Sequence, residues 1–204
     1  MPRWFSVSAL LAVALAGGAR SVAAQAPDNS PAETKAFGLI AGVDFATLTG
    51  SSVSNASSVA GLMGGLFLGF MISPSVEVEP EVLYSQKGSS FSDTDTTFAL
   101  DYIEVPILVK IHLQPEGGLY FAAGPAVDFN VGCNASAAST VSCSTLGLSQ
   151  NLTFGGILAL GYTRGHFGLE GRYDFDFSDA LAVDPFTNLD AKNRVWAILV
   201  RLTR

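Results

Sequence analysis

The chain has 204 residues and a net charge of −7, and 49% of its residues are hydrophobic while only 14% are charged. Lys and Arg cluster nowhere, so the sequence offers no basic patch for nucleic acid. This length allows one large all-β domain or two small ones.

The first residues have the order of a targeting segment. Arg3 precedes the apolar run Trp4–Ala16, and small residues such as Ala24 follow it. This order predicts a secretory signal peptide over residues 1–24. A membrane-anchoring helix is the alternative, but a run of 13 residues is shorter than the roughly 20 that a spanning helix needs. Residues 25–35 are polar and contain prolines, which predicts a flexible periplasmic lead-in.

From residue 36 onward, apolar and polar residues alternate with a period of two, which is typical of β-strands with one apolar and one polar face. The segment from Val76 to Leu113 shows this most clearly, on both sides of a polar stretch rich in Ser, Thr and Asp. The alternation predicts eight strands, over residues 36–48, 59–72, 76–85, 98–113, 119–131, 151–163, 166–177 and 194–202.

The predicted connections alternate in length. Long polar segments at residues 49–58, 86–97, 132–150 and 178–192 are separated by short turns at 73–75, 114–118 and 164–165. Long loops at one end and short turns at the other are typical of outer-membrane barrels. We therefore predict an all-β fold, an eight-stranded antiparallel up-and-down transmembrane β-barrel over residues 36–204.

A soluble sandwich or lipocalin-like barrel would share the alternation. The loop asymmetry, the low charge content and the glycine-rich polar faces favour the membrane barrel. Pro80, Pro106 and Pro125 conflict with it, because a proline in mid-strand removes a ladder hydrogen bond and a closed barrel has no edge. Bulges are one way to accommodate them.

If the apolar faces contact lipid, the polar faces line the lumen. This predicts an interior charge network of Glu77, Glu79, Glu81, Glu104, Lys110, Glu170, Arg172 and Asp174, with Asp44, Asp128 and Arg201 on the same faces. Three cations cannot pair eight carboxylates, so we expect several acids to be protonated or bridged by water. On the outer face, aromatic girdles are expected from Phe37, Phe45, Phe121, Phe129, Tyr162, Phe167, Phe177 and Trp196.

Two cysteines, Cys133 and Cys143, flank a Ser/Ala/Thr-rich segment within a predicted long loop. In an exported protein such a pair predicts a disulfide. A metal-binding pair is the alternative, but neither His nor an acidic residue lies nearby in the sequence to complete a site.

Several segments resemble the outer-membrane β-barrel domain family, the PorT-like or porin-family small outer-membrane proteins of Gram-negative bacteria. The strings PEVLYSQKG (Pro80–Gly88) and YIEVPILVK (Tyr102–Lys110) are the most specific, and the resemblance spans residues 36–202. It implies an eight-stranded outer-membrane barrel that accepts mid-strand prolines, and it implies little about activity. The chain ends in Leu-Thr-Arg, where many such barrels end in an aromatic residue.

Catalytic motifs are absent from the sequence. It contains no P-loop, HExxH or GxSxG pattern. The two histidines, His112 and His166, lie beside predicted short turns, where interfacial roles are expected. Asp174, Asp176 and Asp179, like the pair Asp93 and Asp95, could suggest calcium ligands, but they lack an EF-hand pattern and are expected to be solvated acids. We expect no enzymatic activity, no cofactor and no metal.

The sequence thus predicts a monomeric outer-membrane protein, exported after signal-peptide cleavage, with a filled lumen and a structural or surface-interaction role. Its expected partners are outer-membrane lipid and a surface protein or ligand at the extracellular loops, not nucleic acid. A small pore is the alternative, and an outer-membrane lipid-modifying enzyme is a weaker one.

Overall fold

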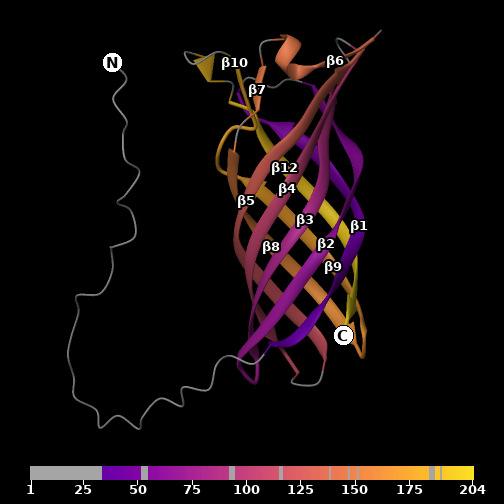
Figure 1. The fold of residues 1–204 in the computed structure, drawn as a ribbon, viewed down its shortest axis with the longest axis vertical. Coiled ribbons are helices and arrows are strands. Elements are labelled where there is room, and N and C mark those ends of the chain that lie inside the picture. Colours follow the sequence, from indigo (N-terminus) through magenta and orange to yellow (C-terminus); the bar gives the residue numbers. More distant parts are fainter. Residues whose placement is uncertain are drawn as a thin grey trace, which may run out of the picture. The chain divides into compact units, whose positions relative to one another are not determined.

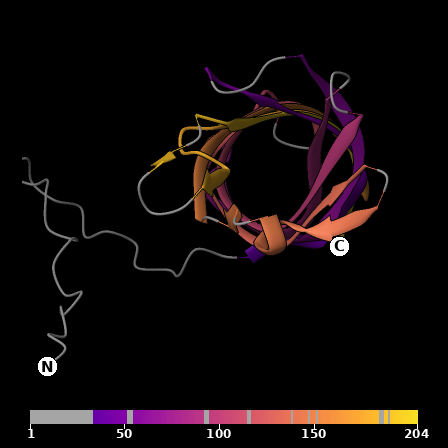
Figure 2. The ribbon, with the colours of Figure 1, turned by 90° about the horizontal axis from the view of Figure 1, so that it is seen from above.

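The segments with period-two alternation form long strands that close into a ring. The computed structural model describes residues 34–51, 55–91, 95–114, 117–137, 139–146, 148–150, 152–183, 187–188 and 190–204. The barrel strands are β1 (Thr34–Thr49), β2 (Ala56–Ser73), β3 (Val76–Phe91), β4 (Thr96–His112), β5 (Gly118–Ser136), β8 (Leu152–Arg164), β9 (Phe167–Asp176) and β12 (Lys192–Thr203). Each pairs antiparallel with its neighbours, and β12 pairs with β1 to close the barrel (Figure 1, Figure 2). The predicted eight-stranded fold is confirmed.

The barrel has two unlike ends. At the turn end, short turns join β2 to β3, β4 to β5 and β8 to β9, and β12 ends there. At the loop end, further short elements lie between the barrel strands: β6 (Thr140–Ser142), the 3-10 helix η1 (Cys143–Leu146), β7 (Leu148–Gln150), β10 (Leu181–Val183) and β11 (Thr187–Asn188). β6 pairs with the end of β5, and β7, β10 and β11 form a separate three-stranded sheet (Figure 1).

The predicted apolar faces point outward. All eight aromatic residues expected on the outer face are exposed, from Phe45 at 43% to Phe167 at 65%. The shortest barrel strand has 10 residues, which matches the roughly 9–11 that a tilted strand needs to cross a bilayer. A closed barrel also pairs its backbone groups internally, as a hydrocarbon environment requires.

The interior is more apolar than the sequence analysis predicts. Ile40, Leu83, Leu108 and Leu199 are buried inside the barrel, on the same faces as the charged residues. A further apolar group, which we call the apolar cap, lies towards the loop end and consists of Leu48, Leu100, Tyr102, Cys133, Cys143 and Ala180. Cys133 and Cys143 form the predicted disulfide within this cap, with their Cα atoms 5.4 Å apart.

The mid-strand prolines interrupt the ladder without changing its register. Pairing of β3 with β4 stops at Pro80 opposite Ile107 and resumes in the same register at Leu83 opposite Glu104. Pairing of β4 with β5 likewise stops at Pro106 and resumes at Val109. The expected bulges are therefore not formed at these prolines, because strands in equal register on both sides of the gap need no extra residue.

Two predicted segments have different boundaries in the structure. The polar stretch 86–97 is largely strand, because β3 continues to Phe91 and β4 begins at Thr96. Its Ser and Thr residues extend the hairpin instead of forming a loop. β1 begins at Thr34, so the last two residues of the predicted lead-in belong to the barrel. The predicted signal peptide, residues 25–33 and Asp93 lie outside the described residues.

Candidate functional site

Charged side chains from four strands meet across the lumen. On β3, residues of one parity point inward and include Glu79 and Glu81, while β9 contributes Glu170 and Arg172. β4 adds Lys110 and β12 adds Arg201. All six side chains are buried, and we call this group the ion-pair belt. The inward direction of each follows from the period of two that places the opposite residues against lipid.

Arg172 is the centre of the belt. Its Nε donates to Glu170 Oε1 at 2.9 Å, and its Nη1 donates to Glu81 Oε2 at 2.9 Å. Its Nη2 donates to Glu81 Oε1 at 3.1 Å and to Glu170 Oε1 at 2.6 Å. The planar guanidinium therefore makes a two-pronged contact with Glu81 and a second one with Glu170, which fixes both carboxylates.

Arg201 links this centre to the turn end. Its Nη1 lies 3.2 Å from both Glu81 Oε1 and Glu170 Oε2, and its Nη2 donates to Glu79 Oε2. Lys110 Nζ donates to the same Glu79 oxygen at 3.0 Å. The belt is thus continuous from β3 and β4 to β9 and β12, and it crosses the bore.

Aromatic rings fill the space beside the belt. Tyr120 donates its hydroxyl to Glu170 Oε2 at 2.6 Å, and Lys110 Nζ lies 4.4 Å from the centroid of the Tyr120 ring. The Arg201 guanidinium lies 4.0 Å from the centroid of the Phe67 ring. Gly161 makes room for Tyr120, because a Cβ at this position would lie 2.1 Å from the tyrosine Cζ. The charged groups are therefore enclosed by packed rings as well as by one another.

A second charged group lies between the belt and the apolar cap. We call it the acidic cluster, and it consists of Asp44, Lys87, Glu104, Asp128, Asp174 and Asp176, all at most 4% exposed. Lys87 Nζ lies 2.6 Å from Asp128 and 3.0 Å from Glu104. The acidic cluster, as defined by these six described residues, thus contains five carboxyl groups and one ammonium group.

Lys87 is the interior cation that the sequence analysis missed, since it lies in the stretch predicted as a loop. With it, the buried charged groups of the described residues number nine carboxyls and four cations, instead of the predicted eight and three. The other predicted lumen residues do lie in the interior. The excess of acids predicted from the sequence therefore remains.

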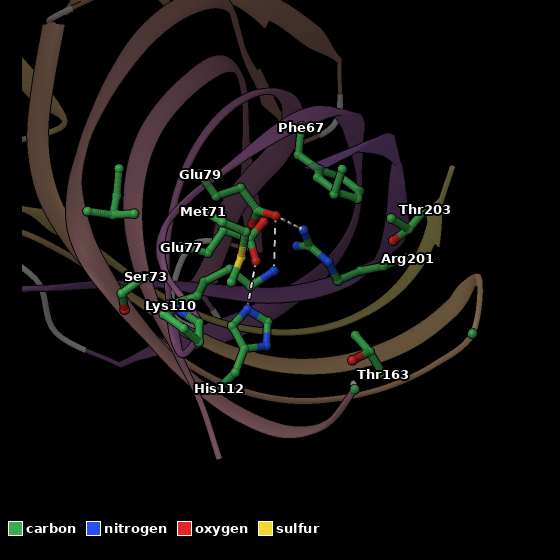
Figure 3. A pocket seen from close by; sticks show the side chains of 15 residues that line it. Phe67, Met71, Ser73, Glu77, Glu79, Lys110, His112, Thr163, Arg201 and Thr203 are labelled. Atoms are coloured by element: carbon green, nitrogen blue, oxygen red, sulfur yellow. Dashed lines mark hydrogen bonds and ion pairs between the residues drawn. The ribbon is translucent and has the colours of Figure 1, made fainter. Parts of the chain in front are cut away.

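A pocket of about 720 Å³ lies at the turn end of the barrel. Figure 3 shows its side chains: Glu79 faces both Lys110 and Arg201, and Glu77 faces His112. Glu77 Oε2 and His112 Nε2 are 2.7 Å apart. Phe67, Met71 and Pro74 form an apolar part of the pocket wall. The pocket therefore ends on the belt.

The remaining titratable candidates are not brought together. His166 donates from Nδ1 to the carbonyl of Thr203 at 3.0 Å, far along the chain from His112. Asp174 and Asp176 are buried inside the barrel, so the expectation that they are solvated acids is wrong, because both lie on the inward face of β9. Asp179 pairs with Lys192 at 3.4 Å. Within the described ranges, no three His, Cys, Asp or Glu side chains are arranged to hold a metal ion.

At the loop end, Asp190 joins two distant parts of the chain. Its Oδ2 accepts hydrogen bonds from the amide and hydroxyl of Ser51 at 3.0 and 2.9 Å, and its Oδ1 lies 2.5 Å from Lys192 Nζ. The pKa of the Asp190 carboxyl lies below its usual value, first because of the Lys192 hydrogen bond and then because of those from Ser51. This contact ties the end of β1 to the start of β12.

Comparison with known proteins agrees with this architecture. The family model described as outer membrane protein beta-barrel domain matches residues 23–182. The chain belongs to this family. It is thus an outer-membrane β-barrel protein. A comparison with curated proteins found no match. None of the described helices is long and apolar enough to cross a membrane.

Solved structures of small outer-membrane barrels are similar. Neisserial surface protein A (NspA) matches with a TM-score of 0.55 and 13% identity, over 82% of this chain and 97% of that chain. Ail of Yersinia pestis matches with 0.46 and 11%, over 83% and 98%. OprG of Pseudomonas aeruginosa matches with 0.38 and 12%, over 82% and 92%. The likeness to NspA shows the fold alone.

Proposed function

We propose that the protein is a non-catalytic surface-interaction barrel with a closed lumen, of the PorT-like kind that the sequence resembles, whose loop end contacts partners outside the cell. The ion-pair belt carries this proposal. Its six side chains are in direct contact and cross the bore. An eight-stranded barrel has an interior that its own side chains can fill.

The loop end supports the second half of the proposal. It bears extra elements braced by the disulfide and by the Ser51–Asp190 contact, whereas the turn end has short turns. In outer-membrane barrels the longer loops are extracellular and the short turns periplasmic. A braced loop end loses less conformational freedom when it binds a partner.

A small pore is the second candidate, and the turn-end pocket favours it. The pocket already opens the turn end of a possible path, as far as Lys110 and Arg201. Transport would require these two side chains to leave Glu79. The tight pairing of this carboxylate with both cations argues for the closed lumen instead.

Conductance in planar lipid bilayers separates the two candidates. The purified protein should give no stable single-channel conductance, because the belt blocks the bore. Lys110→Met and Arg172→Met should either remain closed or give irregular leakage. A stable conductance in the unaltered protein, unchanged by both substitutions, would make the pore the first candidate.

Surface labelling tests the orientation. Epitope tags in residues 49–58, 132–150 or 178–192, or in the connection between β3 and β4 at residues 92–95, should be labelled on intact cells, while tags at Pro74 or Gly117 should be labelled only after the outer membrane is opened. The reverse result would place the loop end in the periplasm and remove the basis for a surface role.

With the orientation established, a photo-crosslinker in a labelled loop reports the partner on intact cells, and the same group at Pro74 is the matched control.

A further inference from the structure

The acidic cluster contains carboxyl oxygens that no described group satisfies. Both oxygens of Asp174 lack a hydrogen-bond partner, as do Asp44 Oδ1, Glu104 Oε1 and Asp128 Oδ1. Asp174 is 4% exposed, so bulk water does not replace the missing partners. A buried carboxylate without a partner is among the costliest groups in a folded protein.

The position of the acidic cluster in the barrel leaves its carboxyl groups no route to bulk water. Towards the turn end it meets the belt, where Arg172 directs four of its five N–H donors to Glu81 and Glu170. Towards the loop end it meets the apolar cap, whose members Leu100 and Tyr102 are 0% exposed. The carboxyl groups therefore cannot turn outward to water.

The charges around the cluster do not balance. The charged or titratable groups around it are Asp44 from β1, Lys87 from β3, Tyr102 and Glu104 from β4, Asp128 from β5, Arg172, Asp174 and Asp176 from β9, and Arg194 from β12. Arg194 donates to the main-chain carbonyls of Asp176 and Asn193, at 2.8 and 2.9 Å, and not to a carboxyl group of the cluster. Thr153 from β8 and Asn193 from β12 add uncharged polar groups. Lys87 is bound by two acids, and Asp176 accepts a hydrogen bond from Asn193 at 2.8 Å. This leaves Asp174 with neither a cation nor a donor of its own.

Two kinds of positive charge could restore the balance, a metal ion or protons. The described carboxyl groups are not arranged to hold a metal ion. Like charges in a confined interior, in contrast, favour binding of a proton. We propose that the acidic cluster is a proton-binding site, in which Asp174 is a neutral carboxylic acid at neutral pH and the other acids share the Lys87 charge.

The consequence is a directional dependence on pH. An unfolded chain exposes the same carboxyl groups to water, where they ionise at the ordinary Asp value of about 3.9. The folded barrel thus carries protons at neutral pH that the unfolded chain has released. The contribution to stability is therefore complete below about pH 3.9, and it decreases as the pH rises from there through neutral until the cluster ionises in the folded barrel, because unfolding releases protons over that whole range.

Infrared spectroscopy of the folded barrel in detergent or lipid tests this directly. At pH 7 the spectrum should contain the carbonyl band of a protonated carboxylic acid, and Asp174→Asn should remove a component of that band. The same variant should fold and lose the decrease in stability between pH 7 and pH 10, because an amide resembles a neutral acid in shape and charge.

Two controls define the outcome. Asp190→Asn should leave the acid band unchanged, because this carboxyl is exposed and ion-paired. Glu81→Gln should destabilise the barrel, because it removes a charge that Arg172 and Arg201 require. The absence of an acid band at pH 7 in the unaltered protein, or a band unchanged in Asp174→Asn, overturns the proposal. If Asp174→Asn fails to fold, the band of the unaltered protein alone decides, and its absence together with a salt-dependent unfolding midpoint indicates a bound cation instead.

Discussion

Replacing Arg172 with Met tests the belt most directly. The substitution keeps much of the aliphatic volume but removes four hydrogen bonds to Glu81 and Glu170. Four such bonds cannot simply be summed, because Arg201 still contacts both carboxylates at 3.2 Å and Tyr120 still donates to Glu170. Breaking one partner of a buried ion pair typically costs about 3–5 kcal/mol. We expect Arg172→Met to lower the free energy of unfolding by that amount.

Urea unfolding of the barrel in detergent micelles, followed by the gel shift between folded and unfolded forms, measures this loss. Arg164→Met is the matched control, because Arg164 is exposed at the turn end, and it should change the free energy by at most about 0.5 kcal/mol. Adding Glu170→Gln to Arg172→Met should recover part of the loss, since it removes a carboxylate left without its main partner.

The same loss for Arg172→Met and Arg164→Met, or a double variant less stable than Arg172→Met alone, would show that the belt does not act through the pairing described above.

Three further predictions concern other parts of the barrel. Gly161→Ala should force Tyr120 away from Glu170 and cost about 1–3 kcal/mol in urea unfolding, while Gly171→Ala, where a Cβ meets nothing closer than 3.9 Å, should be near neutral. Reducing the loop-end disulfide should lower stability by about 2–3 kcal/mol, and two free thiols in mass spectra of the exported protein would contradict its formation. The contact of Asp190 with the Ser51 amide should be complete above the unfolded carboxyl pKa of about 3.9, and it should be lost as the pH falls through the lower pKa of the folded state, because protonation removes the charged acceptor. The NMR shift of the Ser51 amide should therefore stay constant from pH 7 to pH 5. A change of this shift within that range would refute the assignment.

The sequence predicts the wall of the barrel well because one face of every strand must contact lipid. That requirement produces the period of two, and the period alone separates lumen residues such as Glu81 and Arg172 from outward residues such as Trp196. The pairing inside the lumen is a different matter. Which side chains meet across the bore depends on the stagger and tilt of strands that are distant in sequence. No spacing in the sequence indicates that Arg201 contacts Glu79.

The missed cation, Lys87, shows the limit of composition as a guide. Its neighbours are Ser, Gln and Gly, which suggest a loop, yet Ser85, Lys87 and Ser89 continue the inward parity of Glu81 and are all buried. The alternation of inward and outward residues along β3 therefore does predict that Lys87 points inward. The alternation is hard to recognise here because a strand that extends beyond the lipid no longer needs an apolar outer face.

The three mid-strand prolines also determine where the wall is weakest. Ladders beside Pro80 and Pro106 lack pairs in the middle of their strands, whereas β1 and β12 pair over twelve consecutive residues without a shift, from Gly38 to Thr49. The junction between the first and last strands is therefore continuous, although no covalent link crosses it. The β2–β3 ladder also lacks pairs opposite Pro80 and between Ser58 and Met63. A barrel that separates laterally should part first between β2, β3, β4 and β5, within one uninterrupted stretch of sequence, and only later where its two ends meet.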